Sequence, residues 1–179
     1  MTPKPVIIEE FNPEWPKMFQ EIQSILAPTL GDDVLSIEHV GSTSVPGLAA
    51  KPILDIDVVI ESMKSLPVVI AKLETLGYNH QGDLGVEGRE AFERKDEYVP
   101  YSEELKLRMT QHLYVCHRDS QELYRHITFR DALIHNPELV EEYASLKKEL
   151  AIIFRNDRKA YTEGKSDFIQ RVLKQYTLK

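Results

Sequence analysis

The sequence has a single cysteine, Cys116, so an internal disulfide is excluded. The apolar residues before it, Leu113 to Val115, are typical of a strand, and we interpret Cys116 as a packed strand residue rather than a reactive thiol. No run approaches the roughly 20 apolar residues that a membrane-spanning helix needs. The first residues also lack the apolar stretch of a secretory signal. We therefore expect a cytoplasmic protein without a membrane partner.

The chain also lacks an excess of positive charge. Its 22 Lys and Arg residues stand against 29 Asp and Glu residues, which gives a net charge of −7. Because affinity for long nucleic acids comes mostly from neutralising phosphates, we do not expect such a partner. The segment from Lys147 onward is the exception, since basic residues outnumber acidic ones there. This segment is either a solvated helix surface or a basic element that faces an acidic one.

Apolar periodicity and turn residues predict an α/β (α+β) chain with a mixed sheet and flanking helices. Strands are expected at 6–9, 35–40, 53–60, 78–81, 86–95 and 110–117. Helices are expected at 13–30, with Asn12 as its cap, and at 65–76, 122–134, 137–154 and 157–176. No repeat or long linker divides the chain. We predict one domain over 1–179, with an α/β core at 1–118 and a C-terminal helical segment at 119–179.

The segment 39–60 joins a Gly-Ser turn to a strand with paired carboxylates. Side chains alternate along a strand, so Asp55 and Asp57 share one face while Ile56 and Val58 point to the other. Two carboxylates roughly 6 to 7 Å apart along a strand can share a divalent ion or bridge two ions. The pair therefore predicts a metal site for Mg²⁺ (or Mn²⁺).

The turn before this strand predicts a phosphate site. Gly41 permits a tight turn that gathers backbone N–H groups and the hydroxyls of Ser42, Thr43 and Ser44 around a phosphate. Lys51 lies four residues before Asp55, where it could neutralise a phosphate or pair with that carboxylate. We predict nucleotide binding at Gly41, Ser42, Ser44 and Lys51.

These motifs resemble those of known proteins. The order Gly41-Ser42, an interval, then Asp55-Ile56-Asp57-Val58 resembles the signature of the nucleotidyltransferase superfamily, which includes DNA polymerase β and kanamycin nucleotidyltransferase. The fuller text resembles the GrpB family over nearly the whole chain. It comprises His39-Val40-Gly41-Ser42-Thr43-Ser44-Val45-Pro46-Gly47-Leu48, Lys51-Pro52-Ile53-Leu54-Asp55-Ile56-Asp57, His112-Leu113-Tyr114-Val115, Phe129-Arg130-Asp131 and Tyr143-Ala144-Ser145-Leu146-Lys147. That family also looks like an extra C-terminal domain of dephospho-CoA kinase in some bacteria.

The resemblance implies a nucleotidyltransferase-like sheet with a helical C-terminal part. It also implies phosphate binding at Gly41 and Ser42 and Mg²⁺ binding at Asp55 and Asp57. A third carboxylate normally comes from a later strand, but the segment 111–115 has no Asp or Glu. His112 could take that place as a neutral metal ligand or a general base, or it could be hydrogen-bonded beneath the site.

Other side chains leave alternatives open. Tyr114 shares a face with His112 and more often would simply pack. His39 could face the cleft or, as we favour, anchor the turn. Arg130 could contact a phosphate or, slightly favoured, pair with Asp131. Either Glu90 or Glu93 could supply the missing carboxylate, although alternating charges usually mark a solvated edge strand.

Two Tyr-x-x-x-Lys pairs stand on the C-terminal helices. Tyr143 with Lys147, and Tyr161 with Lys165, are four residues apart and share a helix face. The pairs indicate a cationic wall or chance helix chemistry.

Two functions follow from the motifs. The first is an enzyme that moves a nucleoside monophosphate from a nucleoside triphosphate to an unidentified hydroxyl acceptor, with Asp55, Asp57 and His112 as catalytic residues. The alternative is a catalytically degenerate module that binds a nucleotide or a CoA precursor, which the missing third carboxylate favours.

Overall fold

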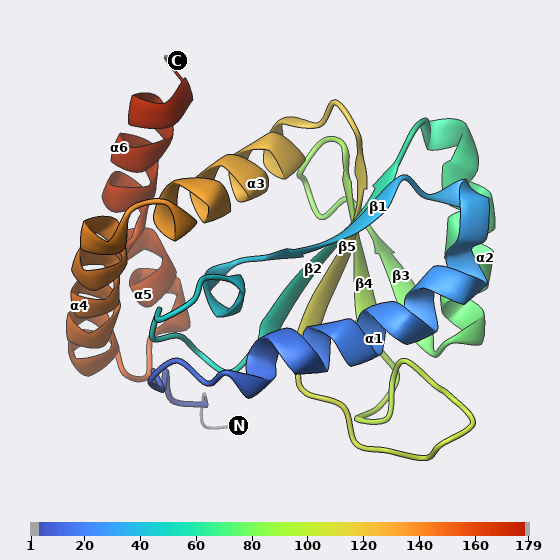
Figure 1. Cartoon of the computed structure of the whole chain (residues 1–179), viewed down its shortest axis with the longest axis horizontal. Coiled ribbons are helices and arrows are strands. Elements are labelled where there is room, and N and C mark those ends of the chain that lie inside the picture. The colour runs from blue at the N-terminus through green and yellow to red at the C-terminus, as the bar shows by residue number, and fades with distance from the viewer. Residues whose placement is uncertain (1–3, 178–179) are drawn as a thin grey trace.

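Five strands form one mixed sheet in the order β1-β2-β5-β4-β3 (Figure 1). A computed structural model describes residues 4–177. The strands are β1 (Ser36–Val40), β2 (Leu54–Ile60), β3 (Tyr78–Gly82), β4 (Arg89–Arg94) and β5 (Gln111–His117). The central pair, β2 and β5, is parallel, and all other neighbours are antiparallel. The predicted α/β class with a mixed sheet is confirmed.

The strand predicted at 6–9 is wrong. Glu9 makes only an isolated bridge with Ala50, and the N–H of Val6 donates to the carbonyl of Arg155 at 2.7 Å. The Val6 side chain is buried beside Leu150. The segment is extended because it lies between the loop before β2 and the C-terminal helices, so its hydrogen bonds go to loops instead of a sheet edge.

Helices cover both faces of the sheet and extend beyond one end of it (Figure 1). The helices α1 (Glu14–Leu30) and α2 (Leu66–Thr75) pack on one face, and α3 (Gln121–Ile134) packs on the other. The helices α4 (Pro137–Ile153), α5 (Arg158–Gly164) and α6 (Ser166–Thr177) gather at the far end of α3. Within residues 4–177, no helix combines the length and the apolar character needed to cross a membrane.

The single helix predicted at 157–176 is wrong, because α5 and α6 are separate. A Cβ at Gly164 would lie 2.6 Å from a methyl carbon of Leu150, so α5 approaches α4 closely at this glycine. The N–H of Lys165 bonds to the carbonyl of Thr162, three residues back, and α6 begins at Ser166. Glycine has a low helix propensity, so the end of a helix at Gly164 costs little free energy.

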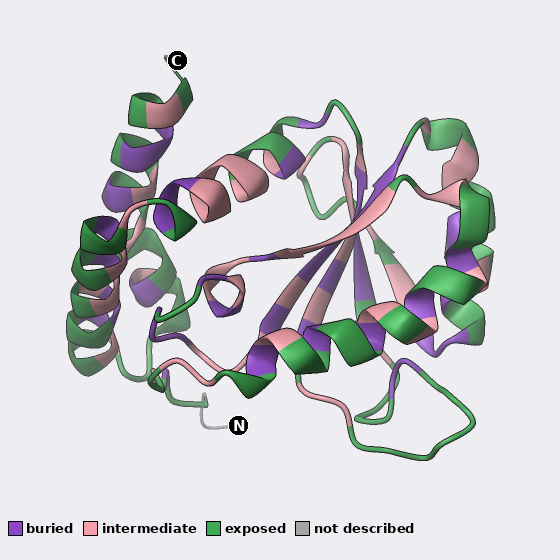
Figure 2. Ribbon diagram, in the orientation of Figure 1, coloured by how far each residue is buried: buried purple, intermediate pink, exposed green. Residues whose placement is uncertain are grey.

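The helix α1 shows how the sequence pattern builds the core. The side-chain oxygen of Asn12 accepts from the N–H of Glu14 at 2.9 Å, and the helix begins at Glu14, one residue later than predicted. Its buried stripe faces the sheet (Figure 2) and ends at Gly31, whose φ is +57°. The buried residues are Trp15, Phe19, Ile22, Leu26 and Leu30. Each contributes about 1.5 to 3 kcal/mol by leaving water.

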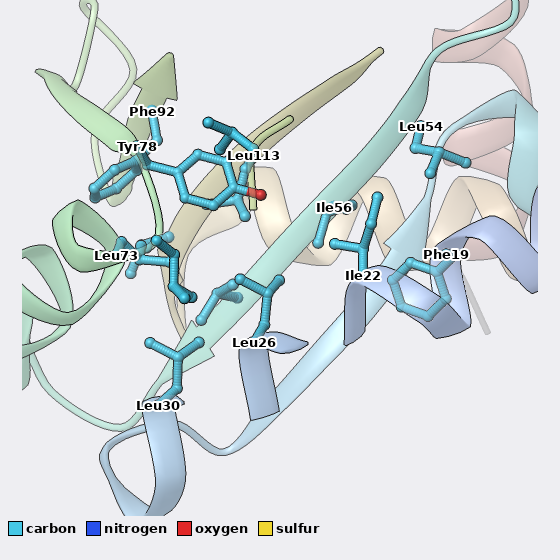
Figure 3. Packing of buried hydrophobic residues seen from close by; sticks show 14 of the residues in the cluster. Phe19, Ile22, Leu26, Leu30, Leu54, Ile56, Leu73, Tyr78, Phe92 and Leu113 are labelled. Carbon is cyan, nitrogen blue, oxygen red and sulfur yellow. The ribbon is translucent and has the colours of Figure 1, made fainter. Parts of the chain in front are cut away.

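The two faces of β2 differ as predicted. Ile56 and Val58 join the main core beneath α1 and α2, and Figure 3 shows Ile56 beside Ile22. The carboxylates alternate with these residues and therefore lie on the face that α3 covers. This alternation places an acidic pair directly opposite the apolar core.

Candidate functional site

Asp55 and His112 lie side by side on the two parallel central strands. The Nδ1 of His112 and the Oδ1 of Asp55 are 3.0 Å apart. An ionised carboxylate only accepts hydrogen bonds, so Nδ1 carries the proton and donates. The Nε2 atom of a neutral His112 then keeps a free lone pair. One hydrogen bond therefore joins His112 to the carboxylate strand and leaves Nε2 of the neutral imidazole able to accept a proton or bind a ligand.

Asp57 is fully buried and pairs with a histidine from α3. The Nδ1 of His126 donates to Oδ2 of Asp57 at 2.6 Å. Burial by itself would lower the pKa of His126, but the hydrogen bond to Asp57 and the nearby carboxylates raise the pKa overall. The raised pKa favours the imidazolium form, whose positive charge offsets the charge of Asp57.

The other oxygen of Asp57, Oδ1, is buried and accepts no hydrogen bond from residues 4–177. A buried carboxylate oxygen without a donor is costly, and a bound cation removes that cost. Asp55 stands two residues away on the same face of β2. The pair therefore fits a divalent cation, although the described part of the chain holds no group of three or more His, Cys, Asp or Glu placed to share one.

The turn at Gly41 is built against the acidic strand. Gly41 has a φ of +71°, and a Cβ there would lie 2.2 Å from Oδ2 of Asp55. The hydroxyl of Ser44 donates to the Gly41 carbonyl at 2.5 Å. Ser44 is therefore engaged within the turn, whereas Ser42 lines the adjoining cavity.

His39 anchors this turn, the interpretation that the sequence favoured. Its Nε2 lies 2.9 Å from the hydroxyl of Thr43, which in turn donates to the carbonyl of Ile53. The ring also stacks on Phe19 with centroids 4.6 Å apart. Burial lowers the pKa of His39 to about 4, so the ring is neutral and donates from Nε2.

A cavity of about 230 Å³ opens beside Asp55. The predicted site residues Ser42, Lys51, Asp55 and His112 line it together. The opposite wall comes from the C-terminal helices and contains Lys147, Arg158, Tyr161, Thr162 and Lys165. The basic C-terminal segment thus faces the acidic strand across one small cavity.

Both Tyr-x-x-x-Lys pairs contribute to this wall. The Nζ of Lys147 lies 4.7 Å from the ring centre of Tyr143, and the Nζ of Lys165 lies 4.7 Å from that of Tyr161. Lys51 approaches Tyr161 from the β1–β2 connection at 5.3 Å. These contacts hold the cations on ring faces and direct them to the same place.

Several sequence candidates lie outside the cavity. Arg130 pairs with Glu38 at 3.0 Å and with Asp131 at 2.8 Å, which supports the salt-bridge interpretation. Glu90 bonds to His80 at 2.6 Å, and Glu93 is exposed. Neither glutamate supplies a third carboxylate to the acidic pair.

Tyr114 packs rather than lining the cavity. It lies opposite Asp57 in the β2 and β5 register, and the guanidinium of Arg89 covers its ring at 4.3 Å. Cys116 on the same strand is fully buried, and burial raises the pKa of its thiol. Both observations agree with packing roles.

Sequence reasoning missed His126. Its contact with Asp57 joins residues 69 positions apart. The only signal in the sequence is a histidine on the helix after β5, and periodicity does not say which strand such a side chain reaches.

The fold resembles a fold of known structure. The mixed sheet with flanking helices is nucleotidyltransferase-like, since the structure of Cid1 in complex with its short product ApU superposes with a TM-score of 0.52. That match covers 78% of this chain and 40% of the other, at 11% identity, and it shows the fold alone. The chain belongs to the GrpB family, whose model, described as GrpB protein, matches residues 5–175. The predicted family is confirmed.

Relatives of known sequence or structure agree. The crystal structure of conserved protein GrpB from Enterococcus faecalis has a TM-score of 0.80 and 33% identity, and covers 95% of this chain and 96% of that one. Glutamate-rich protein GrpB of Alkalihalophilus pseudofirmus is 34% identical over 169 residues, or 94% of each chain. UPF0157 protein YqkA of Bacillus subtilis is 30% identical over 160 residues, which is 89% of this chain. The chain spans only 44% of that relative's length.

One further match is partial. A dephospho-CoA kinase of Mycolicibacterium paratuberculosis is 36% identical over 77 residues, which is 41% of this chain and 19% of that protein.

Proposed function

We propose that the protein is a Mg²⁺-dependent nucleotidyltransferase that moves a nucleoside monophosphate from a nucleoside triphosphate to a hydroxyl acceptor. The observation that carries this proposal is the position of Asp55. It bonds to His112, lies against the Gly41 turn and lines a cavity whose other charged walls are cationic. The candidate base His112, the second carboxylate Asp57 two residues along β2 and the cationic wall are thus all neighbours of Asp55.

Asp55 and Asp57 are the residues that would hold Mg²⁺ (or Mn²⁺). The Oδ1 atom of Asp57 accepts no hydrogen bond from residues 4–177. This supports the assignment, because a bound cation would stabilise a buried carboxylate oxygen that has no donor. A bound divalent ion supplies compensation for the charge on the attacking and leaving oxygens. Ser42 and Lys51 would contact the phosphates from the cavity wall, while Gly41 and Ser44 shape the turn.

His112 would act as the general base. The acceptor hydroxyl gives its proton to Nε2 of His112 as its oxygen forms a bond to the α-phosphorus. The bond from that phosphorus to the bridging oxygen breaks, and pyrophosphate leaves. Asp55 holds the imidazole through Nδ1 and stabilises the imidazolium that forms. The proton thus ends on Nε2 of His112, and the leaving group departs as pyrophosphate.

A second candidate is a degenerate module that binds a nucleotide or a CoA precursor without transferring it. The absence of a third carboxylate beside Asp55 and Asp57 in residues 4–177 favours it. The partial similarity to a dephospho-CoA kinase adds the CoA-precursor option. The two candidates share the cavity and differ in turnover.

Turnover decides between them. The protein is incubated with Mg²⁺, each of the four nucleoside triphosphates labelled at the α-phosphate, and a bacterial small-molecule extract as the source of acceptors. Enzymatic transfer predicts a labelled product that the Asp55→Asn/Asp57→Asn double variant and His112→Ala do not form. His117→Ala, at the other end of β5, is the matched control and keeps the product. Nucleotide binding without product supports the module, and the absence of both nucleotide binding and product contradicts the enzyme and the nucleotide-binding form of the module.

A further inference from the structure

Four cations converge on the cavity beside Asp55. They are Lys51, Lys147, Arg158 and Lys165, and Asp55 is the only carboxylate among the lining residues. In the part of the chain from 4 to 177, none of the four forms an ion pair with a carboxylate. The four positive charges repel one another, and this repulsion destabilises the folded protein unless an anion neutralises the charges.

Burial, and after it the repulsion between the lysines, lowers the pKa values of Lys147 and Lys165. Burial, together with the charges of Lys165 and Lys51, lowers the pKa of Lys147 to about 7. Burial and the charge of Lys51 lower the pKa of Lys165 to about 8, while the weaker pull of Asp55 opposes both shifts. The charged state of the wall is therefore unfavourable in the empty protein.

The burial of Lys147 is a second observation, separate from the pKa shifts, that indicates a bound anion. Only 2% of the residue is exposed, and its Nζ has no hydrogen-bond partner within residues 4–177. The ring of Tyr143 is a weak substitute for the three acceptors that an ammonium group can bind. An apolar side chain of similar volume would fold better at this position. An anion in the cavity would accept hydrogen bonds from Nζ, which would explain why a lysine occupies this position.

The volume of the cavity limits the size of the anion that it can hold. Its volume of about 230 Å³ lies below the roughly 300 to 1,000 Å³ of sites that enclose a drug-sized ligand. A whole nucleotide does not fit, but a short chain of phosphates does. The four cations come from the loop before β2, from α4, from α5 and from Lys165 between α5 and α6, so they surround the anion and match several negative charges.

We propose that this cavity binds the terminal phosphates of a polyphosphate, an anion of two or three linked phosphates, and that it does so without contacting a base. The source is the tail of a nucleoside triphosphate if the proposed function holds, and the anion site itself does not depend on turnover. A second hollow of about 410 Å³ shares Lys51, His112 and Arg158 with the cavity. The nucleoside attached to such a phosphate tail would therefore lie in or beside this second hollow.

Calorimetry without divalent metal tests the site. The probes are inorganic phosphate, pyrophosphate, tripolyphosphate and ATP, each titrated in a chelating buffer at low salt. Pyrophosphate and tripolyphosphate are expected to bind about tenfold or more tightly than phosphate. Lys147→Met and Lys165→Met each weaken tripolyphosphate binding by about tenfold or more, because each removes a charge-assisted hydrogen bond. Lys148→Met is the matched control, since Lys148 is the next residue on α4 but pairs with Glu10 away from the cavity.

Folding provides a second measurement. Lys147→Met is expected to raise the urea midpoint of unfolding while it lowers anion affinity, which a purely structural lysine would not do. Tripolyphosphate binding without ATP binding supports the site and contradicts the proposed nucleotide function. Absence of pyrophosphate and tripolyphosphate binding in the parent, or equal binding by the parent and Lys147→Met, overturns the proposal.

Discussion

Gly41 and Asp55 are in contact across the start of the site. A Cβ on Gly41 would lie 2.2 Å from Oδ2 of Asp55 and 2.9 Å from its Cβ. The glycine therefore has two roles. It permits a tight turn, and because it has no side chain it leaves room for the carboxylate of Asp55. The sequence placed the turn beside the acidic strand, but it did not indicate this direct contact between Gly41 and Asp55.

Gly41→Ala should displace Asp55. The new methyl group meets the carboxylate in a backbone region that L residues avoid, with a φ of +71°. We expect Gly41→Ala to destabilise the protein by about 1 to 3 kcal/mol more than Gly47→Ala, the cost of overpacking. Gly47 is the control because its φ is +79° and no atom lies within 4 Å of a Cβ there. Urea unfolding of the two variants measures the difference, and equal losses would show that Asp55 does not constrain Gly41.

The acidic pair should bind Mg²⁺ or Mn²⁺. The Asp55→Asn/Asp57→Asn variant removes both anionic side chains, so calorimetry should detect binding to the parent and none to the variant. Asp119→Asn, with a side chain 79% exposed, is the control and should bind as the parent does. Identical metal titrations for the parent and the double variant would refute the assignment.

His126 should be important for folding even though the sequence did not indicate it. His126→Ala leaves the buried Asp57 without its partner, which we expect to cost about 3 to 5 kcal/mol in a chelating buffer. His135→Ala, an exposed histidine on the turn after α3, should change stability by about 0.5 kcal/mol or less. The decisive comparison is His126→Ala in an Asp57→Asn background, where the cost should shrink. An unchanged cost in that background would mean that the two side chains are not coupled.

The stability contributed by Lys147 should depend on pH. Its folded-state pKa is lowered to about 7, below the value near 10.4 of an unfolded lysine, so the unfolded chain binds more protons between these values. Stability relative to Lys147→Met should therefore rise from pH 7 to pH 10, by up to about 1.4 kcal/mol per pH unit. Urea unfolding of both proteins at pH 7, 8 and 9 gives this slope. A difference that does not vary with pH would contradict the buried, unpaired state of Lys147.

Patterns within one element were predictable from the sequence. The spacing of Trp15, Phe19 and Ile22 fixes the buried face of α1, and the alternation along β2 separates Asp55 and Asp57 from the core. These predictions succeed because each depends on a local periodicity of backbone geometry. They placed the acidic pair and the Gly-Ser turn without knowledge of the packing.

Contacts between distant elements were not predictable. Asp57 meets His126 only because α3 lies on that face of the sheet, and Lys51 and Lys147 line one cavity only because α4 and α5 lie at that end of the sheet. The sequence marked the Tyr-x-x-x-Lys pairs but did not say where they point. The split of the last helix at Gly164 likewise depends on a neighbour, the side chain of Leu150.

A crystal grown with Mg²⁺ and a non-hydrolysable nucleoside triphosphate would show whether the acidic pair and the cationic cavity form one nucleotide site. We expect a metal ion bound by Asp55 and Asp57, an α-phosphate beside Asp55 and His112, and terminal phosphates among Lys51, Lys147 and Lys165. A nucleotide bound elsewhere, or a metal ion away from the two carboxylates, would refute the proposed site.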